Sequence, residues 1–111
     1  MDVIILKDLP KISLNKWYAG THWAVRNKLK NTYKLIIKAQ ISDVYVKTKQ
    51  YHVKYIFVFK SRPLDASNTV AMIKLIEDII FEDDNYKIVK SITTSSEKGK
   101  EDFVRIEIHE L

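Results

Sequence analysis

The 111-residue sequence contains no cysteine, only two glycines and two prolines, and no apolar run near the ~20 residues of a membrane-spanning helix. The absence of cysteine excludes a disulfide framework and any thiolate metal site, and it fits an intracellular, cytoplasmic protein. With so little glycine and proline, a hydrophobic content of 46% excludes intrinsic disorder. Lys7 and Asp8 interrupt the short apolar patch near the start, so no signal peptide is expected. We therefore expect one soluble domain over residues 1–111.

Acidic residues are almost missing from one half of the chain. Residues 11–60 contain eleven lysines and arginines but only one acid, Asp43, whereas residues 61–111 contain seven basic and eleven acidic residues. The formal net charge is +5, with a sequence pI of about 9.3. Such an asymmetry indicates a polyanionic partner for the basic half and a cationic ligand for the acidic half.

Hydrophobic periodicity predicts an α/β (α+β) domain with the element order β-α-β-α-β-β, in which two helices cover a mixed sheet. Residues 51–60 alternate with period two and predict a strand, and apolar residues at helical spacing predict a helix over 22–40. Residues 41–50 fit either a strand extension or a loop. The remaining expected elements are a strand over 2–7, a loop over 8–21, a helix over 67–80, and an antiparallel hairpin of strands 86–94 and 103–110 that turns at Gly99.

Acidic and basic side chains gather around the second predicted helix. Asp65 precedes this helix, Ser67, Lys74 and Asp78 share one of its faces, and Asp83 and Asp84 follow it. Carboxylate oxygens are the ligands that Mg²⁺ takes, and a lysine beside them can stabilise charge on a phosphate. Plainer readings of the same residues are that Asp65 caps the helix, that Lys74 and Asp78 form an ordinary ion pair, and that Asp83 and Asp84 belong to a solvated turn.

The order of these residues resembles the RusA family of Holliday junction resolvases, in a divergent, phage-type form. The family pattern is Asp-x-Asp-Asn, a helix carrying a lysine and a later aspartate, then Asp-Asp before a strand. It is matched here by Asp65-x-Ser67-Asn68, by Lys74 and Asp78, and by Asp83-Asp84. Asn15-Lys16 also resembles the family's loop after the first strand. Two departures are Ser67 in place of the second aspartate, and Lys74 six residues after Asn68 where the family has three, at Ala71.

The resemblance implies a homodimeric, Mg²⁺-dependent endonuclease that cuts branched DNA symmetrically. It implies Asp65 and Asp84 as the first metal ligands, with Asp83 and Asp78 as further ones, and Lys74 at the scissile phosphate. A symmetric cut implies that two acidic sites lie on one continuous basic surface of the dimer.

For DNA binding, Arg26, Lys30, Lys34 and Lys38 form a basic stripe at four-residue spacing, and Arg26, Lys30 and Lys34 of this stripe are predicted to contact phosphates. Asn15, Lys16 and Trp17 join it, because aromatic residues among basic ones can stack on bases, although such tryptophans also serve as core residues. Two other functions stay open. One is a non-catalytic DNA-binding module of the same fold. The other is a metal-independent ribonuclease that uses His22 or His52.

Overall fold

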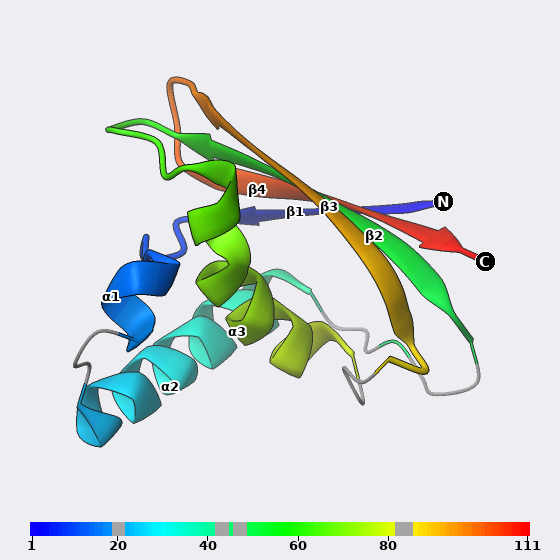
Figure 1. The fold of residues 1–111 in the computed structure, drawn as a ribbon, viewed down its shortest axis with the longest axis horizontal. Coiled ribbons are helices and arrows are strands. Elements are labelled where there is room, and N and C mark those ends of the chain that lie inside the picture. Colours follow the sequence, from blue (N-terminus) through cyan, green and yellow to red (C-terminus); the bar gives the residue numbers. More distant parts are fainter. Residues whose placement is uncertain (19–21, 42–44, 46–48, 82–85) are drawn as a thin grey trace.

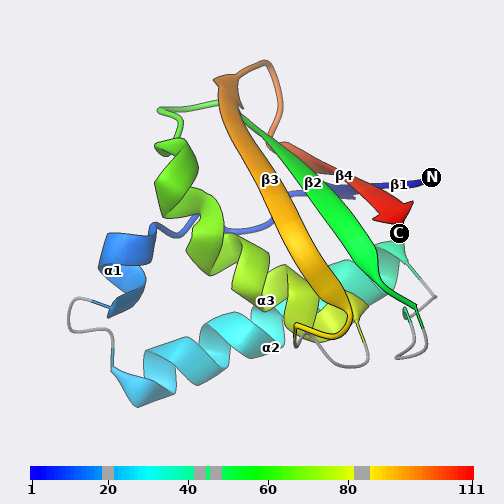
Figure 2. The same ribbon diagram turned by 45° about the vertical axis from the view of Figure 1, so that its right-hand side comes forward.

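The fold is a four-stranded mixed sheet with helices on one side, in a computed structural model that describes residues 1–18, 22–41, 45, 49–81 and 86–111. Its elements are β1 (Asp2–Lys7), α1 (Leu14–Tyr18), α2 (Trp23–Gln40), β2 (Tyr51–Phe59), the 3-10 helix η1 (Ala66–Thr69), α3 (Val70–Ile80), β3 (Val89–Lys98) and β4 (Phe103–Glu110). The predicted α+β class is confirmed. Figures 1 and 2 show α1, α2 and α3 on the same side of the sheet, and none of the described helices covers the other side.

The strands lie in the order β1-β4-β2-β3, with β4 antiparallel to both of its neighbours and β2 parallel to β3. The predicted hairpin of the last two strands is therefore wrong, because β2 lies between them. The β2-η1-α3-β3 segment is a crossover unit, which places β3 parallel to β2 on one side. Strand β4 then pairs with the free edge of β2 on the other side.

Gly99 lies where the chain passes from β3 to β4 across the end of β2. Its N–H donates to the carbonyl of Phe59 over 2.9 Å. A Cβ atom on this residue would lie 2.4 Å from Cγ1 of Val58, which is closer than atoms can approach without a shift. The glycine is thus needed for close passage over β2 and not for a hairpin turn.

Replacing Gly99 with alanine should lower the free energy of unfolding by about 1–3 kcal/mol, the usual cost of an extra methyl group in a packed site. Urea unfolding of the variant measures this loss. Because the clash is with a side chain, Val58→Ala should recover most of it in the double variant. Equal stability of Gly99→Ala and the parent protein would contradict the close passage.

The core lies between the sheet and the helices. Every second residue of β2 is buried, from Tyr51 to Phe59, as the period-two pattern predicts. Strand β4 likewise buries every second residue, namely Val104, Ile106 and Ile108. Most of α3 is buried, and its exposed residues are Lys74 and Asp78. Helix α2 adds Tyr33 and Ile37. None of the described helices is both long and apolar enough to cross a membrane.

Two local expectations differ from the structure. Strand β3 covers Val89–Lys98 instead of 86–94, because Ser95 to Lys98 complete the ladder beside Ile56 to Phe59 in spite of their polar character. The predicted loop over 8–21 contains the short helix α1, which begins after Ser13. The Ser13 hydroxyl accepts from the N–H of Lys16 over 3.1 Å, and its carbonyl accepts from the N–H of Trp17. A side-chain cap of this kind supports one helical turn too short for periodicity to reveal.

Candidate nucleic-acid interface

Helix α2 is held at both ends. At its start, Nδ1 of His22 accepts from the N–H of Ala24 over 3.2 Å, which caps the helix. At its end, the side-chain amide of Gln40 makes two hydrogen bonds with the backbone of Lys7 on β1, at 2.8 and 2.9 Å. The helix therefore presents its side chains from a fixed position against the sheet.

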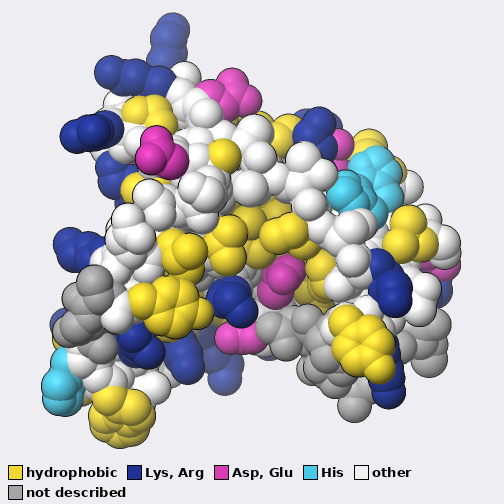
Figure 3. Space-filling model, viewed as in Figure 1, with side chains coloured by type: hydrophobic (Ala, Val, Ile, Leu, Met, Phe, Trp, Pro, Cys, Tyr) yellow, Lys and Arg dark blue, Asp and Glu magenta, His cyan; other side chains and the backbone are white. Residues whose placement is uncertain are grey.

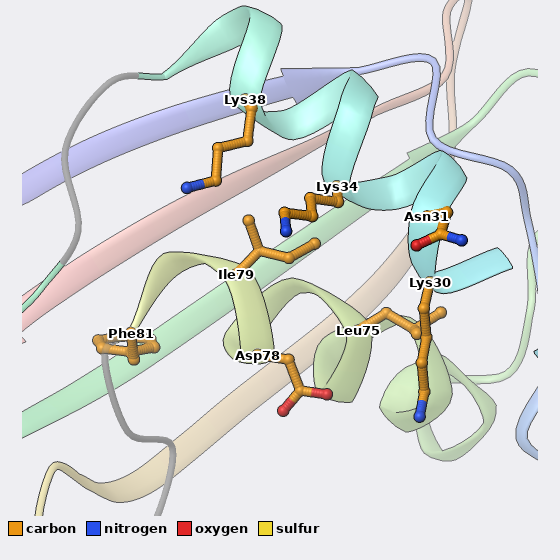
Figure 4. A pocket seen from close by; sticks show the side chains of 8 residues that line it. All are labelled: Lys30, Asn31, Lys34, Lys38, Leu75, Asp78, Ile79 and Phe81. Atoms are coloured by element: carbon orange, nitrogen blue, oxygen red, sulfur yellow. The ribbon is translucent and has the colours of Figure 1, made fainter. Parts of the chain in front are cut away.

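Three lysines of α2, at positions 30, 34 and 38, line a cavity of about 410 Å³ between α2 and α3. We call this cavity the basic groove; its other lining residues are Asn31, Leu75, Asp78, Ile79 and Phe81. In Figure 4, Lys30 from α2 and Asp78 from α3 extend into the same opening, and Lys34 lies above Ile79. The groove combines an apolar wall from α3 with a lysine row spaced by one helical turn.

The surroundings of the groove are basic on the α2 side. Helices α1 and α2 contain six basic residues and no acidic residue. Figure 3 shows dark blue side chains gathered at the lower left, over this helical part of the molecule, with hydrophobic side chains exposed among them. Among the described residues that line the groove, three lysines face one acid, Asp78, and this excess of positive charge attracts polyanions and raises their association rate.

Arg26 and Trp17, two of the predicted DNA contacts, hold α1 against α2. Trp17 is only 8% exposed. The Nη2 group of Arg26 donates to the Trp17 carbonyl over 2.6 Å, and the guanidinium lies 5.2 Å from the Trp17 ring centroid and 5.8 Å from that of Tyr18. The Nε of Arg26 is buried without a hydrogen-bond partner in the described structure. Trp17 is thus a core residue, and Arg26 is a link between helices.

The other predicted DNA contacts lie at the surface. Asn15 and Lys16 are exposed on α1, and Lys30 and Lys34 are exposed on α2. The lysines of α2 are therefore exposed to a ligand, whereas the buried Trp17 is not.

The predicted metal ligands divide into a described and an undescribed group. Asp65 and Asp78 are exposed, and the helical path between them is about 20 Å long, from the rise per residue of η1 and α3. Asp83 and Asp84 lie outside the described residues. Within the part of the chain that the structure describes, no three acidic or histidine residues come together as a metal site. Asp65 and Asp78 alone do not fit a magnesium ion, and its assignment to Asp65 and Asp84 stays a prediction.

Asp65 does not cap a helix with its side chain. It holds the N-cap position of η1, but only its carbonyl takes part, accepting from the N–H of Asn68 over 2.8 Å. Ser67, which replaces the family's second aspartate, is exposed, and Lys74 is exposed on α3. The capping explanation for Asp65 is therefore not seen in the structure.

Sequence reasoning missed a buried carboxylate, Glu77 on α3. It is 9% exposed, and its Oε2 accepts from the Tyr55 hydroxyl of β2 over 3.0 Å. Burial raises the pKa of Tyr55, and the charge and hydrogen bond of Glu77 raise it further. A glutamate within an apolar helix face is the signal that could have identified this pair.

His52 is held on the open side of the sheet by two hydroxyl groups of β3. Its Nδ1 lies 2.7 Å from Oγ of Ser91 and its Nε2 3.2 Å from Oγ1 of Thr93. The ring of His109 on β4 faces it at 6.1 Å between centroids. Both nitrogens of His52 are thus engaged in hydrogen bonds within the sheet.

No family model matches the chain, and no curated protein or solved structure is significantly similar to it.

Proposed function

We propose that the protein binds DNA through the basic groove and acts on branched DNA in the cytoplasm. The observation that supports the proposal is the row of exposed lysines at positions 30, 34 and 38 of α2. Neither α2 nor the neighbouring α1 contains an acidic residue. Lysines spaced by one helical turn offer successive charges to a phosphate backbone, which supplies most of the affinity in protein–DNA complexes.

The specific activity within this proposal is symmetric cleavage of four-way junctions by a homodimer with Mg²⁺. It rests on the sequence resemblance to the RusA family. The exposed carboxylate of Asp65 and the exposed lysine at position 74 support it, because both are open to a ligand. When bound, Mg²⁺ would supply a polarised phosphate and an activated water. Lys74 would stabilise negative charge on the phosphate at its Nζ.

The test combines binding and cleavage. Labelled four-way junctions and matched linear duplexes are titrated with protein, with Mg²⁺ and with a chelator, and light scattering gives the mass of each complex. Paired symmetric cuts that require Mg²⁺, made by a dimer, would support the full proposal. Binding without cutting would leave the non-catalytic module, and chelator-resistant cutting of RNA alone would favour the ribonuclease. No binding to any nucleic acid would contradict the proposal.

Asp65→Asn should reduce junction cleavage by about 100-fold or more if Asp65 is a metal ligand, since even residues behind the ligands cost 10–100-fold. DNA binding should persist or tighten, because one negative charge near the phosphates is removed. Stability should not change, since the Asp65 side chain makes no capping bond. Glu110→Gln, at the far end of the sheet, is the control for loss of an exposed acid. A stable Asp65→Asn variant that cuts at the parent rate would exclude the metal-ligand role.

A further inference from the structure

Two aromatic side chains are exposed where α1 meets α2. Trp23, the first residue of α2, is 74% exposed, and Tyr18, the last residue of α1, is 58% exposed. Aromatic side chains of this size usually bury most of their surface in a soluble domain. An exposed tryptophan at the start of α2 and an exposed tyrosine at the end of α1 therefore need an explanation beyond the packing of one chain.

Trp23 lies on the same face of α2 as the lysine row. It precedes Lys30 by seven residues, which at 3.6 residues per turn is two turns with an offset of about 20°. The distance along the axis is about 10 Å from Trp23 to Lys30, and about 12 Å more to Lys38. The aromatic side chain and the three lysines thus lie in one stripe, about 80° wide, along the helix.

The position of Tyr18 is fixed by a buried anchor. Its ring lies 5.8 Å from the guanidinium of Arg26, which in turn donates to the carbonyl of Trp17 in the core. Because Arg26 is itself half-buried, this part of α1 is held against α2 and Tyr18 does not depend on a partner for its place. The exposed ring of Tyr18 is thus held in place by contacts within the chain.

The charge of the surroundings selects the class of partner. The sequence from Lys11 to Ile41 has seven basic residues and no acidic residue. Aromatic faces combined with such a charge match a strand of nucleic acid whose bases are unpaired, since each base has a face for stacking and each phosphate a negative charge. Paired bases within a duplex do not expose their faces in this way.

We propose that Trp23, assisted by Tyr18, stacks on unpaired bases while the lysine row holds the phosphates of the same strand. The inference rests on the proposed function and adds a preference for single-stranded segments, such as those of an opened junction, over continuous duplex. The line from Trp23 to Lys38 is about 22 Å long, which matches about seven nucleotides of a strand that keeps the ~3.4 Å spacing of stacked bases, and fewer of a more extended strand. Oligonucleotides shorter than this should bind less tightly.

The test uses the fluorescence of the two tryptophans. An eight-nucleotide oligothymidine should quench emission of the parent protein, because Trp23 stacks on a base. In Trp23→Phe the remaining Trp17 is buried, so binding should persist without quenching. Trp23→Ala should bind the oligothymidine about tenfold more weakly, with unchanged affinity for blunt duplex. Leu35→Ala is the matched control, because Leu35 is also 74% exposed on α2 but is turned about 140° from Lys30.

Each of the other possible results contradicts one part of this proposal. If Trp23→Ala binds oligothymidine and duplex as the parent does, the stacking inference is wrong while the basic groove stands. If neither nucleic acid binds the parent, the proposed function itself fails. If quenching follows protein concentration without DNA and disappears in Trp23→Ala, the aromatic face is an interface between copies of this chain.

Discussion

Replacing Lys30, Lys34 and Lys38 together with alanine should weaken binding to branched and linear DNA alike, by roughly one to two orders of magnitude at low salt. Each lysine that touches a phosphate releases a counterion when DNA binds. The slope of log affinity against log salt concentration should therefore flatten by about one unit per lysine, or about three in total. Anisotropy titrations of a labelled duplex and a labelled four-way junction over a range of salt concentrations measure both quantities.

Lys28 provides the control for this experiment. It is exposed on the same helix but is turned about 160° from Lys30 and about 80° from Lys38, and it does not line the basic groove. Lys28→Ala removes one charge from the helix without removing one from the groove, and it should leave the slope nearly unchanged. If Lys28→Ala and each single groove variant lowered the slope equally, then only net charge would matter and the groove would not be the DNA contact.

Alkaline pH should destabilise the fold steeply, because two tyrosines are buried in their neutral form. Burial raises the pKa of Tyr33, and burial together with Glu77 raises the pKa of Tyr55. Their stabilising effect is complete below the unfolded pKa of about 10 and is lost as pH rises toward the folded values. Each such tyrosine removes about 1.4 kcal/mol per pH unit in that window, so the two together remove about 2.8 kcal/mol per pH unit.

Urea unfolding between pH 8 and the alkaline limit measures this loss. In Tyr33→Phe the dependence on pH should fall to about half, while the hydrogen bond that Tyr33 donates to the carbonyl of Pro10 is also removed. Phenolate absorbance offers an independent readout, since Tyr33 and Tyr55 should ionise only as the protein unfolds. Ionisation of all six tyrosines in the folded state would show that the two rings are accessible to solvent.

The sequence predicts those parts of the fold that depend on local periodicity. The alternation from Tyr51 to Phe59 specifies a strand with one buried face, and α2 follows its apolar spacing. The pairing of β4 with β2 was not predictable in this way, because β3 and β4 are close in sequence and the crossover, not the loop, decides their separation. Helix α1 was likewise not predictable, because its five residues are too few to show a helical hydrophobic period.

For the candidate site, periodicity gave the lysine row but not the exposure of the aromatic residues. Trp17 and Trp23 occur in the same run of sequence, yet one is buried under Arg26 and the other is open. Only the docking of α1 against α2 distinguishes them. In the same way, Asp65 has the chemistry of a cap by sequence, but the 3-10 turn that follows it uses its carbonyl instead of its carboxylate.

The strand order has a consequence for how the protein is made. Strand β1 precedes the other described strands in the chain, but β4, which follows all of them, is the only described strand that pairs with it, and β4 also forms one whole side of β2. During synthesis on the ribosome, β1 therefore has no partner strand until β4 has emerged, and the interior of the sheet closes in the final step. The apolar residues of β1 and β2 stay open to chaperones during this time. Ribosome-bound chains that end before Phe103 should accordingly remain sensitive to protease throughout the sheet.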